Sequence, residues 1–436
     1  MKNENTPIYD ARALGWPKLL LLGLQHTFAM FGATVLVPII TGLNVSTALL
    51  TAGLGTLLFH FLTKGKVPAF LGSSFAFLSG FALVAPKLPD GSPNLEMLPY
   101  ATGAVVVAGL VYVIFSLLIS LFGVQRVMRL FPPVVTGPII VSIGLILAPS
   151  AITNASTNWA LAFVALASIV VCNIWGKGMV KIMPILIGIG VAYAVAAVTG
   201  NIDFTAINAA KVFAMAPITA PKFDITAIVT IVPIAIATMV EHIGDVAAIS
   251  ATCEKNFIED PGLQRTILGD GLATMLAGFL GGPANTTYGE NTGVLVLTQI
   301  FDPLVVRIAA VFAIALSFVP KFGAIINTIP TAIIGGVSFI LYGMISAVGV
   351  RNIVENKVDF TQTRNLIIAA VILVSALGFN ATGGITFAIA GVSITLSGLA
   401  VAAIAGIALN LILPGNDYNF YIAKEDGEPE QITEEA

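Results

Sequence analysis

The chain has 436 residues, of which 57% are hydrophobic and only 10% charged, and its mean hydropathy is +0.96. A net charge of -3, with no basic cluster longer than a pair, excludes a nucleic-acid-binding protein. The composition is typical of a polytopic membrane protein built from helices.

A spanning helix needs about 20 apolar residues, and we expect about 14 such segments in this chain. The N-terminal segment, residues 1–16, is polar and lacks the features of a signal peptide, so we expect the first helix to stay in the mature protein. Continuous spans are then predicted at residues 18–40, 47–63, 102–122, 159–175 and 182–199, with a further one opening at Pro132.

The predicted third span is interrupted by polar and helix-breaking residues. Residues 66–77 place Pro68, Gly72 and two serines where an uninterrupted apolar run is expected. Proline and glycine break helices, so we expect a broken element here.

A second broken element is predicted at residues 281–293, between apolar segments at 268–280 and 294–300. Its centre is Glu290. Irregular backbone at membrane depth is tolerated where it lines a protein-enclosed cavity, and a carboxylate there indicates a functional site. The alternative is a re-entrant turn that only packs.

Features of the first half return in the second. Gln25-His26 corresponds to Glu241-His242, Pro68-Ala69 to Pro283-Ala284, and Phe131-Pro132 to Ile329-Pro330, in the same order along the chain. We therefore predict two repeats, residues 17–200 and 224–413, joined by a connecting stretch at 201–223. Seven spans in each half, an odd number, would invert the second repeat. The alternative is chance matching in a biased composition.

The distribution of Lys and Arg predicts the orientation of the chain in the cytoplasmic (inner) membrane. With the N-terminus in the cytoplasm, 4 of the 20 basic residues fall outside, namely Lys87, Lys211, Lys222 and Lys321. Both termini are then cytoplasmic, and the acidic tail at 414–436 is expected to be disordered. Cys172 and Cys253 have no disulfide or metal-ligand spacing, so we expect packing thiols and no metal site.

Glu241 and Asp245 are four residues apart and share a helix face. Two carboxylates close together in low dielectric repel, so at least one should keep its proton near neutral pH. Such a group suits proton-coupled transport. His26 and His242 are expected to be hydrogen-bonded inside the bundle, and for Asp270 a shallow structural position and a functional one both stay open.

These groups would form a receptor for a flat, neutral heterocycle. Glutamate accepts from ring N–H groups, the amides of Tyr288 and Gly289 donate to ring carbonyls, and an aromatic face such as Phe75 stacks on the ring. An anion exchanger or channel would require a positive group at the binding site, and no Lys or Arg lies near Phe75 or Glu290 in sequence. An enzyme would require a catalytic triad or a set of metal ligands at membrane depth, and the sequence shows neither.

Four motifs resemble the nucleobase/ascorbate transporter family and, within it, the bacterial uracil permeases. They lie at residues 25–33, 72–77, 241–244 and 285–291, and the resemblance covers essentially the whole chain. It implies an all-α fold of 14 spans in inverted repeats, with short strand-like breaks in spans 3 and 10. Spans 1–4 and 8–11 would form a core domain, and spans 5–7 and 12–14 a gate domain.

The resemblance also implies roles for single residues, a homodimer, and uracil and protons as the transported partners, with no cofactor. Glu241 and Glu290 would hold the base. The site would be lined by Phe75, Ser74, Tyr288 and Gly289, with Tyr342 facing it from the gate domain. Proton coupling would involve Asp245, Glu241 and Glu290, and a supporting polar network would comprise Gln25, His26, His242 and Asn291.

One position departs from the pattern. Uracil permeases commonly have a histidine where this chain has Asp245, and an aspartate there resembles the purine-transporting branch. The resemblance therefore leaves uracil and a purine such as xanthine or uric acid as alternative substrates.

Overall fold

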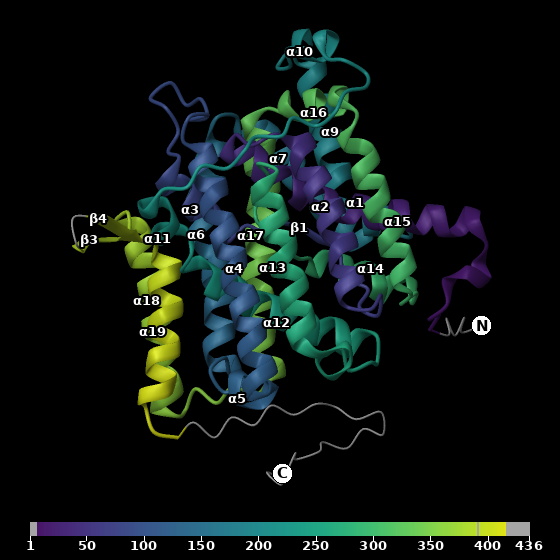
Figure 1. The fold of residues 1–436 in the computed structure, drawn as a ribbon. Coiled ribbons are helices and arrows are strands. Elements are labelled where there is room, and N and C mark those ends of the chain that lie inside the picture. Colours follow the sequence, from purple (N-terminus) through teal and green to yellow (C-terminus); the bar gives the residue numbers. More distant parts are fainter. Residues whose placement is uncertain (1–6, 390–391, 416–436) are drawn as a thin grey trace.

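The computed structural model describes residues 7–389 and 392–415, apart from the side chains of Glu290, Ile389, Val392 and Ser393. It consists of packed helices with two small two-stranded sheets (Figure 1). The first half comprises η1 (Ala11–Leu14), α1 (Trp16–Thr41), α2 (Val45–Leu62), β1 (Leu71–Ser73), α3 (Leu78–Val84), α4 (Leu98–Phe122), α5 (Val124–Met128), α6 (Pro133–Ser156), α7 (Trp159–Trp175), α8 (Met179–Ile182), α9 (Pro184–Val198) and α10 (Thr205–Ala209).

The second half begins after the connecting stretch. It comprises α11 (Ile225–Ile231), α12 (Ile234–Thr252), η2 (Ile258–Gly262), α13 (Leu263–Phe279), β2 (Asn285–Thr287), α14 (Gly289–Thr298), α15 (Pro303–Ser317), α16 (Pro320–Asn327), α17 (Thr331–Glu355), α18 (Thr363–Ala381), β3 (Ile385–Ile389), β4 (Val392–Leu396) and α19 (Gly398–Ile412). The predicted acidic tail lies outside the described residues from 416 onward.

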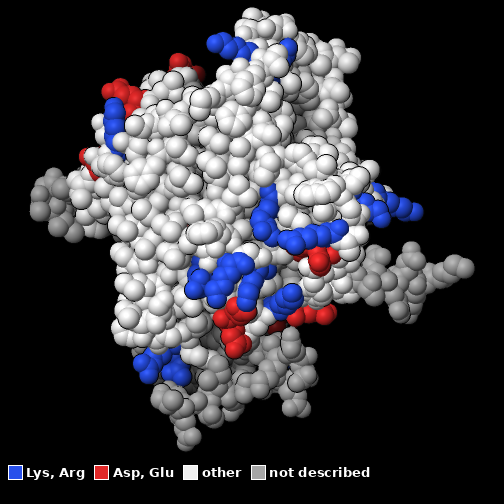
Figure 2. Space-filling model, turned by 45° about the vertical axis from the view of Figure 1, so that its right-hand side comes forward, with Lys and Arg blue, Asp and Glu red and all other residues white. Residues whose placement is uncertain are grey.

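The chain is a multi-pass membrane protein. Within the described residues, 7 helices are long and apolar enough to cross a bilayer, or 8 if α15 and α16, which meet at 84°, count as one bent span. The other apolar segments are shorter or broken. Charged side chains gather in patches and leave wide areas of uncharged surface (Figure 2).

Helices from the two halves pack in matching pairs. α2 packs on α15 and α4 on α13, while α6 packs along α17. Small residues allow these close approaches, because a Cβ added at Gly109 of α4 would lie 2.6 Å from the carbonyl oxygen of Gly271 in α13. Exchanging the two halves turns the α2–α15 pair into the α13–α4 pair, since α2 and α13 each precede a broken element and α4 and α15 each follow one.

Both broken elements contain a short strand, and the two strands pair. β1 and β2 are antiparallel, with Gly72 opposite Thr286. Side chains of neighbouring helices satisfy further backbone groups, since Thr56 bonds to both the amide and the carbonyl of Leu71 and Thr274 donates to the Asn285 carbonyl. This pairing explains how extended backbone is accommodated in the interior of a membrane protein.

The hairpin of β3 and β4 was not predicted from the sequence, which led us to expect only helix there. Its strands are antiparallel, with Ile385 opposite Leu396, and β4 packs against α11. Gly383 and Gly384, both at positive φ, end the preceding helix and lead into the hairpin. Alternating residues such as Thr386 and Phe387 favour a strand, but they lie in a run whose high hydropathy resembles that of a span.

Candidate functional site

The two broken elements meet at the centre of the molecule. The Ser74 amide donates to the Ala284 carbonyl at 2.8 Å, and the Tyr288 amide donates to the Phe70 carbonyl at 3.0 Å. These bonds extend the strand pair at both ends. The next residues along the chain, Phe75 and Gly289, therefore lie where each strand gives way to helix.

Tyr288 differs from the sequence expectation, because its amide is bonded to the sheet and not left to donate to a ligand. Its ring is buried behind β1, where the hydroxyl donates to the Ser73 carbonyl at 3.0 Å and accepts from Thr34 at 3.2 Å. Gly72 makes room for this ring, since a Cβ there would lie 2.5 Å from it. Tyr288 thus ties β1, β2 and α1 together.

Asp245 of α12 faces the second broken element. Asp245 Oδ2 accepts from the Thr287 hydroxyl at 3.1 Å, and a Cβ added at Gly289 would lie 3.5 Å from Asp245 Oδ1. Glu241 lies one helical turn earlier, and both acids are half-buried. The structure therefore brings Asp245 to the start of α14, as the shared helix face allowed.

Glu290 is the second residue of α14, and its side chain lies outside the described part of the structure. The next residue, Asn291, is buried and donates from Nδ2 to Nδ1 and to the carbonyl oxygen of His26, at 3.1 and 3.2 Å. Asn291 thereby fastens the start of α14 to α1.

Phe75 of the first broken element forms an aromatic pair with Tyr342. Phe75 and Tyr342 are 6% and 2% exposed, and their rings meet edge to face at a centroid distance of 5.8 Å. Tyr342 belongs to α17, as expected for the twelfth span. The hydroxyl of Ser74, the residue before Phe75, is buried, with no hydrogen-bond partner among the described residues.

Asp270, for which the sequence left a shallow structural position and a functional one open, lies inside the protein. It is fully buried in α13, with Oδ2 3.2 Å from Nδ1 of His242. The same nitrogen lies 3.4 Å from the Thr287 hydroxyl, which bonds to Asp245. Asp270, His242, Thr287 and Asp245 thus lie close together in a polar cluster, and sequence spacing alone indicated none of these contacts.

The four residues expected to form one supporting network make three separate sets of contacts. His26 pairs with Asn291, and His242 joins the chain to Asp270. Gln25 instead donates from Nε2 to the sulfur of Met179 in α8, at 2.6 Å. Gln25 therefore links α1 to the connection between α7 and α9.

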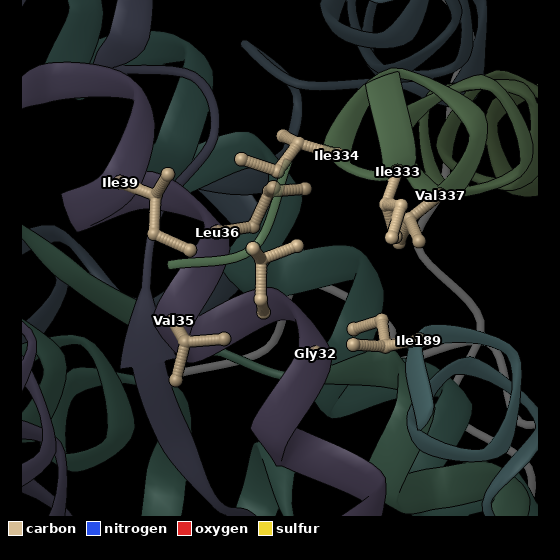
Figure 3. Close-up of a pocket in the computed structure, with 9 residues that line it drawn as sticks. Gly32, Val35, Leu36, Ile39, Ile189, Ile333, Ile334 and Val337 are labelled. Atoms are coloured by element: carbon tan, nitrogen blue, oxygen red, sulfur yellow. The ribbon is translucent and has the colours of Figure 1, made fainter. Parts of the chain in front are cut away.

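A small cavity of about 10 Å³ lies where α1 faces α9 and α17 (Figure 3). Its lining is aliphatic apart from Gly32, with Val35 and Leu36 on α1, Ile189 on α9, and Ile333 on α17 among the residues drawn. A larger hollow of about 520 Å³ lies at the ends of α1, α2 and α4 beside the connecting stretch. Neither of these two cavities is lined by Phe75 or Glu241.

Paired broken elements with carboxylates beside them, inside a bundle of apolar helices, define a membrane transport protein. The family described as "Permease family" matches residues 17–385. The chain belongs to this permease family, whose members transport and do not catalyse a reaction, so the resemblance found in the sequence is confirmed.

Individual relatives agree with the family. The chain is 45% identical to a uracil permease of Bacillus caldolyticus, over 91% of this chain and 92% of that protein. It is 43% identical to a uracil permease of Bacillus subtilis (strain 168), over 90% and 91% of the two chains. Among solved structures, the transmembrane domain of the cyanobacterial bicarbonate transporter BicA matches with a TM-score of 0.63 and 16% identity, over 87% of this chain and 99% of that one. This likeness concerns the fold alone.

Proposed function

We propose that this permease imports uracil together with protons across the cytoplasmic membrane. The observation that carries the proposal is identity above 40% to proteins named uracil permease, over nine-tenths of both chains. A neutral pyrimidine needs hydrogen-bond acceptors and an aromatic surface, which the carboxylates of α12 and α14 and the ring of Phe75 would provide.

In the proposed site Glu241 and Glu290 accept from the ring N–H groups of the base. The amide of Gly289, at the N-terminal end of α14, donates to a ring carbonyl. Phe75 packs against the ring, with Ser74 beside it. Because Phe75 and Tyr342 are in contact, a planar ring can enter only when α17 moves away from the broken elements.

That movement suggests alternating access between two domains. The core domain would comprise α1–α4 with β1, and α11–α15 with β2, while the gate domain would comprise α6–α9 and α17–α19. The tightest packing supports this division, since α4 with α13 and α2 with α15 lie within the core and α6 with α17 within the gate. The aliphatic contact between α1 and α17 would let one domain slide on the other (Figure 3).

The proposed topology has about 14 spans in two inverted repeats, residues 17–200 and 224–413, with both termini in the cytoplasm. The shorter and broken segments complete this number, namely β1–α3, α7, α9, α13, β2–α14, α15 and α19. The matched helix pairs of the two halves support a duplication. We further propose a homodimer, as the resemblance implies.

Asp245 would carry the coupled proton. It bonds to Thr287 beside the start of α14, so its charge state can influence the groups that hold the base. The same residue favours a second candidate function, symport of a purine such as xanthine or uric acid, since aspartate at this position resembles the purine-transporting branch.

Binding to the purified protein in detergent tests the proposed substrate. Labelled uracil should bind saturably and be displaced by unlabelled uracil far better than by xanthine or uric acid. Tighter binding of xanthine would establish the second candidate. Bicarbonate serves as the control anion, and displacement of uracil by bicarbonate would contradict a site built for a neutral ring.

A further inference from the structure

We propose that the segment formed by residues 7–14, called here the N-terminal strap, is a positioning element for the substrate site. It joins the C-terminal ends of α12 and α14, the two helices that carry the acidic groups. The inference depends on the proposed function only in taking α12 and α14 as the helices that hold the base.

The strap is bonded to the loop that follows α14. The Ile8 amide donates to the Gln299 carbonyl at 2.9 Å, and the Phe301 amide donates to the Ile8 carbonyl at 2.8 Å, which forms a parallel bridge to Ile300. Figure 1 draws the strap in purple, beyond α15 at the right of the molecule. The loop residues Gln299 and Ile300 directly follow the last turn of α14, so this bridge fixes the end of that helix.

Asp302 provides a second attachment. Its Oδ1 accepts from the Leu304 amide and caps α15, while its Oδ2 accepts from the Ala11 amide, each at 2.8 Å. The side chain is 8% exposed, so both oxygens make their bonds away from water. Apolar packing surrounds this attachment in a cluster separate from the main core, formed by Ala11, Leu19, Leu22, Ile300 and Val305.

Tyr9 extends the strap to α12. Its hydroxyl donates at 3.1 Å to the carbonyl of Cys253, the residue that ends that helix. The ring lies against Phe301 at a centroid distance of 5.6 Å and beneath the Lys255 ammonium group at 4.3 Å. Burial and the nearby Glu254 carboxylate raise the pKa of Tyr9 above its ordinary value of 10.0, so the hydroxyl remains a donor at physiological pH.

α14 is therefore held at both ends, and α12 is held at its C-terminal end. α14 has 10 residues, or about 15 Å, with its first residue fixed by the strand pair and its last by the strap. α12 meets α14 beside Asp245 and is tied to the same strap through Cys253. Because every contact of the strap falls within the proposed core domain, it would move with the site and set its geometry without acting as a gate.

Two variants loosen the strap at different points. Asp302→Asn keeps one oxygen, which can accept from only one of its two amide partners, and turns an NH2 group toward the other. Tyr9→Phe removes the bond to α12 but keeps the ring. Asp224→Asn is the matched control, because Asp224 caps α11 through the Ala227 amide and has no described contact with the strap.

Uracil uptake into proteoliposomes should show KM raised about three- to tenfold in each strap variant, the effect expected from one lost positioning hydrogen bond, with the maximal rate within about twofold of the original. The double variant should add little to the larger single effect, because both changes release the same segment. Unchanged KM values together with a lower melting temperature would show that the strap only stabilises the fold and would overturn the proposal.

A readout without substrate separates failure of this inference from failure of the proposed function. Spin labels at Ala251→Cys in α12 and Val296→Cys in α14, with Cys172 and Cys253 replaced by alanine, report the distance between the two helices. Tyr9→Phe and Asp302→Asn should broaden the distance distribution, and Asp224→Asn should not. If the original protein takes up no uracil, the proposed function fails, and a broadened distribution still supports the positioning role. An unbroadened distribution overturns it.

Discussion

The two broken elements share a backbone plan but differ in chemistry. Each has a three-residue strand that pairs with the other, and each strand leads into a helical segment. After the first strand come Ser74 and the apolar Phe75, whereas after the second come Tyr288, whose ring is buried behind β1, and then Gly289, Glu290 and Asn291. The first element thus continues with an aromatic residue and the second with polar ones. A substrate bound between them would take its hydrogen bonds almost entirely from the second element and α12.

The largest effect on uracil binding is expected for substitution of Glu290, the acidic residue of the second broken element. Glu290→Gln should weaken uracil binding about fivefold to a hundredfold or more, because part of the acceptor becomes a donor and its pairing with a ring N–H, worth roughly 1–3 kcal/mol, is mismatched. Equilibrium binding in detergent measures this loss. Glu254→Gln, at the exposed end of α12, is the control and should bind normally. Near-normal affinity of Glu290→Gln would remove this side chain from the site.

Substitution of Asp245 tests whether this residue of α12 also carries the coupled proton. Asp245→Asn should abolish accumulation driven by a pH gradient while uracil still exchanges down its own gradient, because the amide cannot take up and release the coupled proton. Counterflow and gradient-driven uptake are compared in the same vesicles, with Asp260→Asn as a surface control. If the variant still concentrates uracil, Asp245 is structural and another acid carries the proton. Recovery of uracil uptake with loss of purine uptake in Asp245→His would assign base selection to this residue as well.

Substitution of Phe75, on the first broken element, should weaken binding without changing its pH dependence. Phe75→Ala is expected to weaken uracil binding about tenfold, since an aromatic contact contributes roughly 0.5–1.5 kcal/mol beyond the area it buries. The pH dependence of binding should not change, because Phe75 carries no proton. Phe75→Tyr keeps the ring and should retain most of the affinity. A shifted pH profile in Phe75→Ala would indicate that the ring positions a titrating group.

The smallest effect on binding is expected at Tyr288, which supports the strand pair from behind. Tyr288→Phe removes the hydroxyl bonded to Ser73 and Thr34 and should lower stability by about 1–3 kcal/mol, with affinity within about twofold of the original. Thermal unfolding and uracil binding are measured on the same sample. Tyr193→Phe, which loses a single bond to Thr328, provides a peripheral comparison. Lost affinity without lost stability in Tyr288→Phe would place its hydroxyl in contact with the substrate.

The sequence predicted the broken elements because proline and glycine interrupt apolar runs at Pro68 and Pro283. It also predicted that Glu241 and Asp245 share a face, since helical periodicity is a local property. The bond from the Tyr288 amide to Phe70 and the contact of Asp270 with His242 join segments far apart in the chain. Such contacts depend on strand register and helix packing, which local patterns do not encode. A three-residue strand is likewise too short to show a period of its own.

The proposed proton-coupled transport of uracil is tested most directly by uptake of labelled uracil into proteoliposomes, with and without an imposed pH gradient. The account predicts that a gradient acidic outside drives uracil above its equilibrium level inside, that a protonophore abolishes this accumulation, and that xanthine is not concentrated under the same conditions. Uracil uptake that ignores the gradient, or accumulation of xanthine in preference to uracil, would contradict it.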